Sequence, residues 1–143
     1  MDKSFHYMMM AVQSHFSRRI MEDAAKMSLT TGQPKVLDYL SLHNGSIQKD
    51  IAAGCCIDVA TMTGILSRME DKGLIERRNK NGNRRSLYVY LTEKGKRTAQ
   101  EVQNIFLLNE QTAFSGLDSK EKEQFLETLY KICKNLTDTE VLQ

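Results

Sequence analysis

A group of small, hydroxyl-bearing and basic side chains lies between positions 60 and 68, in a segment whose apolar residues recur at helical spacing. Thr61, Gly64 and Arg68 are three and four residues apart, which places them along one line of a helix. Small side chains let a helix enter the major groove of DNA, hydroxyl groups bond base edges or phosphates, and a methyl group can contact thymine. The candidate contact residues are Ala60, Thr61, Thr63, Gly64, Ser67 and Arg68. The alternative is a small-residue face that packs on another helix.

A second set of basic residues surrounds Asn81-Gly82, a dipeptide that favours a tight hairpin turn. Lys80, Arg84 and Arg85 would project near the tip of this hairpin. An arginine at such a tip can enter a minor groove, where the negative potential is concentrated. Three more basic residues are interpreted as phosphate contacts or as solvated charges: Lys72, Arg77 and Arg78.

The net charge of +2 conceals an uneven distribution along the 143 residues. Residues 1–67 carry six basic and six acidic residues, residues 68–97 carry ten and four, and residues 98–143 carry four and eight. A basic block beside a neutral and an acidic one favours a localised contact with a polyanion, although a solvated charged face would give the same count.

The elements that position these residues follow from the hydrophobic spacing and the capping residues. The first helix is predicted over residues 5–27. The second follows a capping box from Thr30 to Gln33 and has Pro34 in its first turn. The third and fourth helices begin after the N-caps Ser46 and Asp58. The predicted buried faces of the second and fourth helices are Val36, Leu37, Leu40 and Leu42, and Val59, Met62, Leu66 and Met69. The two short helices on either side of residues 54–57 form a helix-turn-helix. Alternating residues over 74–78 and 84–92 then predict a β-hairpin, so the pattern is that of a winged helix.

Three amphipathic helices flank this module. The first covers residues 5–27, the fifth begins after an N-cap at Thr92, and the sixth begins at Asp118 and carries apolar residues from Phe125 to Leu136. They are too long and too peripheral to cover the central module, so we expect them to pack against a second copy; an intrachain bundle is the alternative. The predicted fold is mainly α with a small β-hairpin wing, in one domain over residues 1–143. Residues 29–97 form the winged helix-turn-helix, and residues 1–28 and 98–143 form the dimerisation helices.

Other classes of protein lack support in the sequence. No phosphate-binding glycine loop, dinucleotide fingerprint or nucleophile motif is present, so we expect no enzyme and no cofactor. The three histidines and three cysteines show no metal-ligand spacing. The longest apolar run, residues 7–12, is far shorter than the ~20 residues of a membrane span, and nothing before it resembles a signal peptide, so we expect a cytoplasmic location.

Several segments together resemble the MarR family of bacterial winged helix-turn-helix regulators. They are Leu29-Thr30 with Gln33, residues 57–75 ending in Met69-Glu70-Asp71-Lys72-Gly73-Leu74-Ile75, and Asn83-Arg84-Arg85 followed by Leu91-Thr92-Glu93-Lys94-Gly95. The wing signature of that family is D-x-R-x-x-x-x-x-L-T. Arg85, Leu91 and Thr92 match it, whereas Asn83 stands where the family usually has aspartate, which removes a charge that could order the wing.

The resemblance implies a homodimer that binds double-stranded DNA at a pseudo-palindromic operator, usually as a repressor released by a small molecule, a metal or an oxidant. Lining residues for the small-molecule cavity are proposed from their places in the first two helices: His15, Phe16 and Tyr39. Cys55 is interpreted as a small core residue and Cys56 as a more exposed turn residue, with redox sensing as the minor alternative. Two other functions stay open: a winged helix that binds proteins, and a metal-dependent regulator of the same fold.

Overall fold

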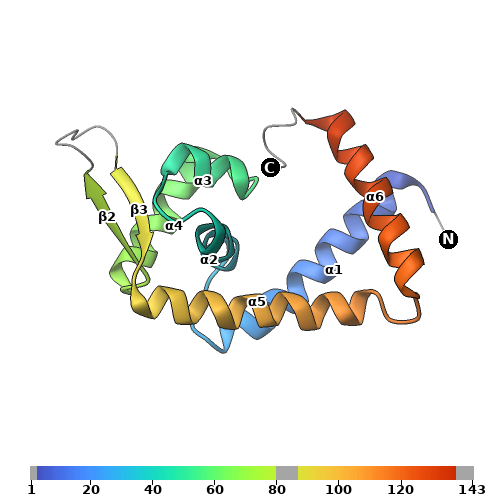
Figure 1. Ribbon diagram of the computed structural model, residues 1–143, viewed down its shortest axis with the longest axis horizontal. Coiled ribbons are helices and arrows are strands. Elements are labelled where there is room, and N and C mark those ends of the chain that lie inside the picture. Colours follow the sequence, from blue (N-terminus) through green and yellow to red (C-terminus); the bar gives the residue numbers. More distant parts are fainter. Residues whose placement is uncertain (1–2, 80–86, 138–143) are drawn as a thin grey trace.

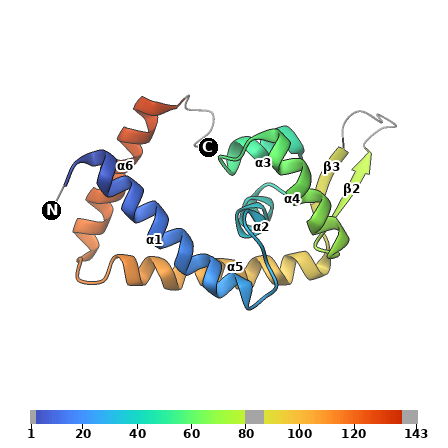
Figure 2. The ribbon, with the colours of Figure 1, turned by 180° about the vertical axis from the view of Figure 1, so that it is seen from behind.

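Helix α5 (Glu93–Ala113) is the axis along which the other elements of the computed structural model are arranged (Figure 1). The structure describes residues 3–79 and 87–137. The wing strands lie at one end of α5, and α6 and the start of α1 lie toward the other end (Figures 1 and 2). In chain order the elements are α1 (Phe5–Ala25), α2 (Gln33–Leu42), β1 (Ser46–Ile47), α3 (Gln48–Gly54), α4 (Val59–Asp71), β2 (Ile75–Asn79), β3 (Leu87–Leu91), α5 and α6 (Ser119–Leu136). This confirms the predicted fold class.

The N-caps predicted for the last three helices are confirmed by their hydrogen bonds. Asp58 accepts from the backbone N–H of Thr61 at 2.8 Å, and Thr92 accepts from that of Gly95 at 3.0 Å. Asp118 and Glu121 form a reciprocal capping box at the start of α6. Each bond satisfies a backbone donor that has no partner inside its own helix. The starts of these three helices could therefore be predicted from the sequence.

The start of α2 differs in part from the prediction. The Gln33 side chain accepts from the backbone N–H of Thr30, as in a capping box, but the N-cap is Gly32 at φ 88° and the helix begins at Gln33. A side chain added at Gly32 would meet Ile65 of α4 at 2.5 Å. Close packing on α4, together with the left-handed backbone, therefore selects glycine here.

The sheet has three antiparallel strands in the order β1-β3-β2, one more than the predicted hairpin. Ile75 pairs with Leu91 and Arg77 with Val89, while Ser46 pairs with Val89 from the other edge. The prediction of Ser46 as a helix N-cap is wrong, because Ser46 lies in β1 and Ile47 precedes α3. A two-residue strand has no alternation that a sequence pattern can reveal. The predicted tip around Asn81-Gly82 lies outside the described residues.

The core joins α2, α3 and α4 to the sheet and to α5. Its fully buried members include Leu37, Leu40, Ile51, Met62 and Leu66. Two predicted core residues are wrong: Leu42 is 76% exposed and Val59 is 51% exposed. Leu42 is the last residue of α2 and Val59 is the first residue of α4. Both therefore lie at a helix terminus, beyond the buried side of the helix.

Helix α1 is tied to α5 through a buried amide. Asn109 is 4% exposed, donates to the Asp23 carboxylate at 3.0 Å, and accepts from Arg19 Nε at 3.2 Å. The hydrogen bond from Asn109 lowers the pKa of the Asp23 carboxyl below its ordinary value. Because a buried amide costs stability unless its partners are in place, this network fixes how α1 lies on α5.

The outer helices keep most of their apolar surface exposed. Only Ile20 and Ala24 of α1 are buried, and no described residue of α6 is buried. The exposed apolar residues of α1 are Phe5, Tyr7, Met8, Met9, Met10 and Val12, and those of α6 are Phe125, Leu126, Tyr130 and Leu136. Exposed apolar side chains that gather on one helix are typical of surfaces that bind another molecule.

Candidate nucleic-acid interface

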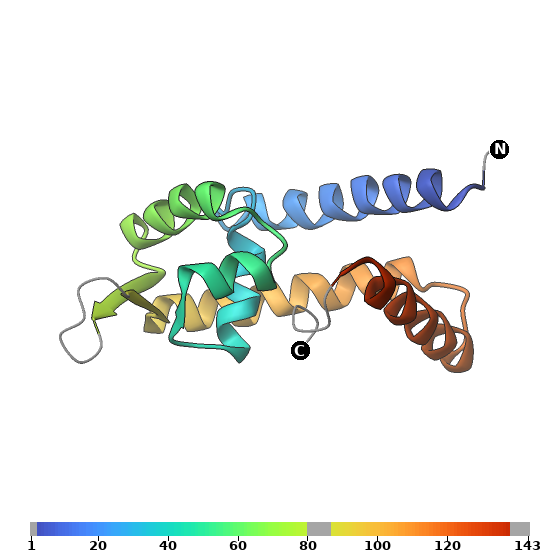
Figure 3. The ribbon, with the colours of Figure 1, turned by 90° about the horizontal axis from the view of Figure 1, so that it is seen from above.

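Helices α3 and α4 form the helix-turn-helix, and α4 turns one side away from the core (Figure 3). Met62, Ile65, Leu66 and Met69 of α4 are buried. The opposite side consists of Ala60, Thr61, Thr63, Gly64, Ser67 and Arg68, which we call the outer face of α4. Gly64 is half-buried and the other five are exposed. The structure therefore brings together the residues that the sequence singled out on this helix.

The hydroxyl groups of the two threonines of the outer face are engaged within the protein. Thr61 Oγ1 donates to Asp58 Oδ2 at 2.7 Å, and Thr63 Oγ1 donates to the Val59 carbonyl at 3.2 Å. The hydrogen bonds from Thr61 hold the pKa of the Asp58 carboxyl below its usual range, so Asp58 stays ionised and keeps the cap in place.

Arg68 lies over Gly64. A side chain added at Gly64 would meet the Arg68 guanidinium at 3.1 Å, so the glycine leaves room for the arginine along the helix. Within the part of the chain that the structure describes, Arg68 makes no ion pair, and its guanidinium keeps donors for a phosphate or a guanine.

The other basic candidates are placed differently. The Lys72 ammonium donates to the Ser28 carbonyl at 2.6 Å and to Gln33 Oε1 at 3.0 Å, which ties the end of α4 to the turn before α2. Arg77 lies 3.6 Å from the Glu70 carboxylate with only 20% of its side chain exposed. Lys80, Arg84 and Arg85 lie outside the described residues.

Sequence reasoning missed Gln48, the first residue of α3. Its Nε2 group donates to the Val59 carbonyl at 3.1 Å and to Thr63 Oγ1 at 2.7 Å, so it connects the two helices of the motif at the outer face. The only sequence signal was a long polar side chain in the first turn of the helix before the recognition helix.

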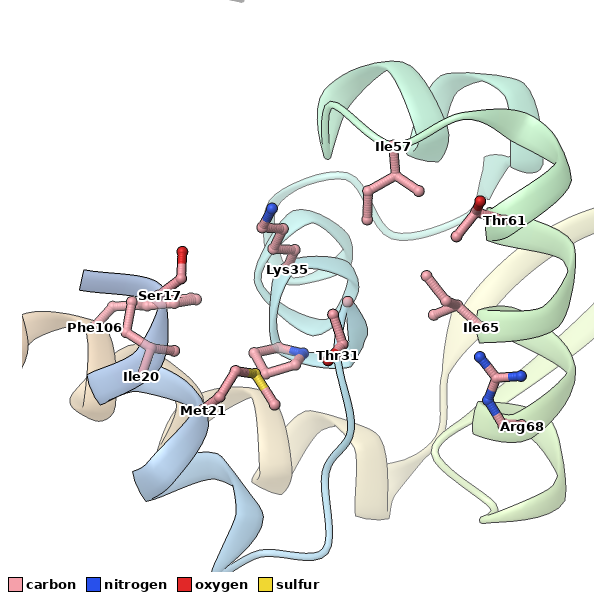
Figure 4. Close-up of a pocket in the computed structure, with 12 residues that line it drawn as sticks. Ser17, Ile20, Met21, Thr31, Lys35, Ile57, Thr61, Ile65, Arg68 and Phe106 are labelled. Carbon is pink, nitrogen blue, oxygen red and sulfur yellow. The ribbon is translucent and has the colours of Figure 1, made fainter. Parts of the chain in front are cut away.

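A cavity of about 350 Å3 lies between α1, α2 and α4 (Figure 4). Thr61, Ile65 and Arg68 of α4 form one side, and Ile20, Met21 and Phe106 form the other.

The three predicted lining residues, His15, Phe16 and Tyr39, are not among those around this cavity. Phe16 instead borders a shallower groove with Asp38, whose carboxyl pKa is raised by burial. Tyr39 stacks on His43 with ring centroids 4.6 Å apart, and His15 is exposed.

The adjacent cysteines occupy opposite environments. Cys55 is buried, and burial raises the pKa of its thiol to about 11, which keeps it protonated and unreactive at neutral pH. Cys56 is exposed, at φ 54° in the turn between α3 and α4.

This difference predicts selective alkylation. Iodoacetamide at neutral pH should label Cys56 in the folded protein and leave Cys55 unlabelled until denaturant unfolds the chain, as peptide mapping by mass spectrometry would show. Equal labelling rates for the two thiols in the folded protein would contradict the assignment of Cys55 to the core.

Residues 3–79 and 87–137 contain neither a cluster of side chains that could hold a metal ion nor a single helix that could span a membrane. No group of three or more His, Cys, Asp or Glu side chains is placed to hold a metal ion there. No single helix there has both the length and the apolar composition of a membrane span; α3 and α4 together have them, but the two helices are bent by 107° relative to each other.

The fold is a winged helix-turn-helix, and comparison with known proteins shows which family it resembles. Residues 29–87 match the sequence model of the MarR family. The HTH-type transcriptional regulator BilQ of Clostridioides difficile (strain CD3) is 27% identical over 135 residues, which cover 94% of this chain and 86% of BilQ. The chain is therefore similar to the MarR family of winged helix-turn-helix transcriptional regulators, most directly over residues 29–87.

Solved structures agree over nearly the whole chain. The transcriptional regulator SlyA superimposes with a TM-score of 0.84 at 27% identity, covering 99% of this chain and 100% of SlyA. S. aureus MepR in its complex with DNA superimposes with a TM-score of 0.82 at 26% identity, covering 94% and 97%. Regulators of this family bind DNA, and transcriptional regulation is a non-enzymatic role.

Proposed function

We propose that this protein is a cytoplasmic, ligand-responsive repressor that binds a pseudo-palindromic operator as a homodimer. Residues 29–97 form its DNA-binding region, and residues 1–28 and 98–143 form its dimerisation region. The observation that carries the proposal is the outer face of α4, a row of small, hydroxyl and basic residues on the side of the recognition helix that the core leaves open.

The contacts are divided between α4 and the wing. The outer face of α4 enters the major groove, with Arg68 as its charged donor. Arg84 enters the minor groove, and Lys80 and Arg85 contact phosphates or support the wing. Arg77 and Lys72 contribute positive potential near the DNA backbone, while their contacts with Glu70, Ser28 and Gln33 also give them a structural role.

The homodimer is supported by the exposed apolar residues of α1 and α6. A monomer would leave Phe5, Met10, Phe125 and Tyr130 each about half exposed to water. A two-fold partner that covers the same surfaces would remove that cost and bring two α4 helices to one side of the assembly.

Salt dependence tests the DNA contact. Each phosphate contact contributes about −0.9 to the slope of log K against log salt concentration, so a dimer with a few contacts per subunit should show a slope steeper than about −3. Fluorescence anisotropy with a labelled mixed-sequence duplex at several salt concentrations measures it. A slope near zero would contradict the proposal and favour a winged helix that binds proteins.

The effector site is assigned to the cavity beside α4. Thr61 and Arg68 belong both to the cavity wall and to the outer face of α4, so a ligand there touches the recognition helix directly. A ligand changes DNA affinity only if it binds two conformations of the protein with different affinities. A ligand that contacts α4 would have different affinities for two conformations in which α4 is placed differently.

A cavity-filling variant tests this assignment. Met21→Trp places a larger side chain in the cavity from α1, away from the DNA face, so we expect normal DNA affinity and loss of effector response. Compounds are first found in a fragment screen of the wild type, by shifts in both melting temperature and DNA affinity. An equal response in Met21→Trp, or no such compound in the wild type, would contradict the assignment.

A further inference from the structure

The polar groups at the start of α4 use their hydrogen-bond donors inside the protein. A hydroxyl has one donor and an amide has two. Thr61 gives its donor to Asp58, and Thr63 gives its donor to the Val59 carbonyl. Gln48 Nε2 gives one N–H to the same carbonyl and the other to Thr63 Oγ1. This end of the interface therefore offers oxygen acceptors and methyl groups, but no donors from these three side chains.

The same end of α4 exposes apolar surface. Val59 is 51% exposed in the first turn of the helix, and Ala60 beside it is exposed as well. With their hydroxyls turned to Asp58 and Val59, Thr61 and Thr63 add methyl groups that take part in no hydrogen bond. Four residues within five positions thus present methyl groups where the helix enters the proposed groove.

We infer that these methyl groups recognise the 5-methyl groups of thymine in the operator. Most polar groups that bases present in the major groove are hydrogen-bond acceptors: guanine O6 and N7, adenine N7 and thymine O4. These acceptors require protein donors, which Gln48, Thr61 and Thr63 at this end of the interface do not offer. The thymine methyl is the apolar group that the major groove presents, and it fits an apolar surface. Hydrogen bonds that the protein donates to bases then come from the other end of the outer face, where Arg68 lies. The inference rests on the proposed binding of DNA through α4.

The amide of Gln48 makes this arrangement rigid. Its two hydrogen bonds hold the Thr63 hydroxyl and the Val59 carbonyl together, so the Thr63 side chain cannot rotate its hydroxyl toward a base without breaking a bond at 2.7 Å. The methyl contact is therefore prepared before DNA binds.

Replacement of thymine by deoxyuridine tests the inference, because it removes the methyl group and leaves the hydrogen-bonding edge and the backbone unchanged. The operator is the duplex that wild-type protein enriches from a random pool, synthesised once with thymine and once with uracil at each thymine position in turn. We expect about fourfold weaker binding for each contacted methyl group that is lost. Uracil placed only in the flanks outside the enriched site is the matched control and should change nothing.

Two conservative variants assign the effect to this surface. Val59→Thr keeps the branched shape and replaces a methyl by a hydroxyl, whereas Thr63→Ser removes the methyl and keeps both hydrogen bonds of the hydroxyl. Each should weaken binding to the thymine duplex and lose its sensitivity to uracil at one position. Thr63→Val, which keeps the methyl, should retain that sensitivity.

Failure of the inference differs from failure of the proposed function. If wild-type protein binds its enriched duplex equally well with thymine or uracil, or if both variants keep the full sensitivity to uracil, thymine recognition by this surface is wrong while DNA binding stands. If no sequence is enriched at all, the proposed function itself is wrong.

Discussion

Leu126→Glu should convert the protein into a monomer and abolish tight operator binding. Leu126 is 42% exposed in the single chain, on the side of α6 that also carries Phe125. In the proposed dimer this surface is buried, and an uncompensated charge there costs about 3–5 kcal/mol. Since each 1.4 kcal/mol is about tenfold in affinity, the dissociation constant of the dimer should rise by roughly 100-fold or more. Sedimentation equilibrium at micromolar concentration measures the change.

Lys131→Glu is the matched control. It introduces the same side chain five residues further along α6, on the exposed polar side, and alters the net charge even more. It should leave the protein dimeric. A fully dimeric Leu126→Glu, or a wild-type protein that is monomeric at micromolar concentration, would contradict the assignment of α6 to the dimer interface.

Gly95→Ala should lower the free energy of unfolding by about 3 kcal/mol, near the upper end of what overpacking costs. A methyl group added at Gly95 would lie 1.9 Å from the Leu74 carbonyl oxygen, a backbone atom that cannot rotate away. The same carbonyl accepts from Thr92 N, so a displacement also disturbs the start of α5 and its attachment to the wing strands. Urea denaturation followed by circular dichroism measures the loss.

Gly64→Ala is the same exchange in another helix with the opposite expected sign. Its added methyl group meets only the flexible end of Arg68, so higher helix propensity should raise stability by up to about 1 kcal/mol. The variant should bind DNA more weakly, because the methyl group fills the outer face of α4. A Gly95→Ala variant as stable as wild type would contradict the close approach to Leu74.

Local signals in the sequence were enough to predict most of the fold. Asp58, Thr92 and Asp118 mark helix starts because a capping side chain bonds a backbone donor only a few residues away. The helix-turn-helix and the wing strands follow from a change in hydrophobic period. The strand β1 was not predicted, because its two residues pair with residues of β3 that lie more than forty positions later in the sequence.

The candidate site was predictable by residue type but not by contact. The outer face of α4 follows from helical spacing, whereas the partners of its side chains depend on where other elements lie. Lys72 donates a hydrogen bond to Ser28, which is 44 positions away in the sequence. Gln48 of α3 donates a hydrogen bond to Thr63 of α4. The cavity is lined by Met21, Lys35 and Phe106 from three helices, so no single periodicity could have identified it in place of His15 and Tyr39.

Selection from a random pool of DNA duplexes with the full-length protein tests the central claim most directly. In the proposed dimer, two α4 helices related by a two-fold axis would contact successive major grooves on one side of the duplex. The account therefore predicts enrichment of an inverted repeat whose half-site centres lie about 10 base pairs apart. No enrichment, or enrichment of a single asymmetric half-site, would contradict a dimer that binds DNA through α4.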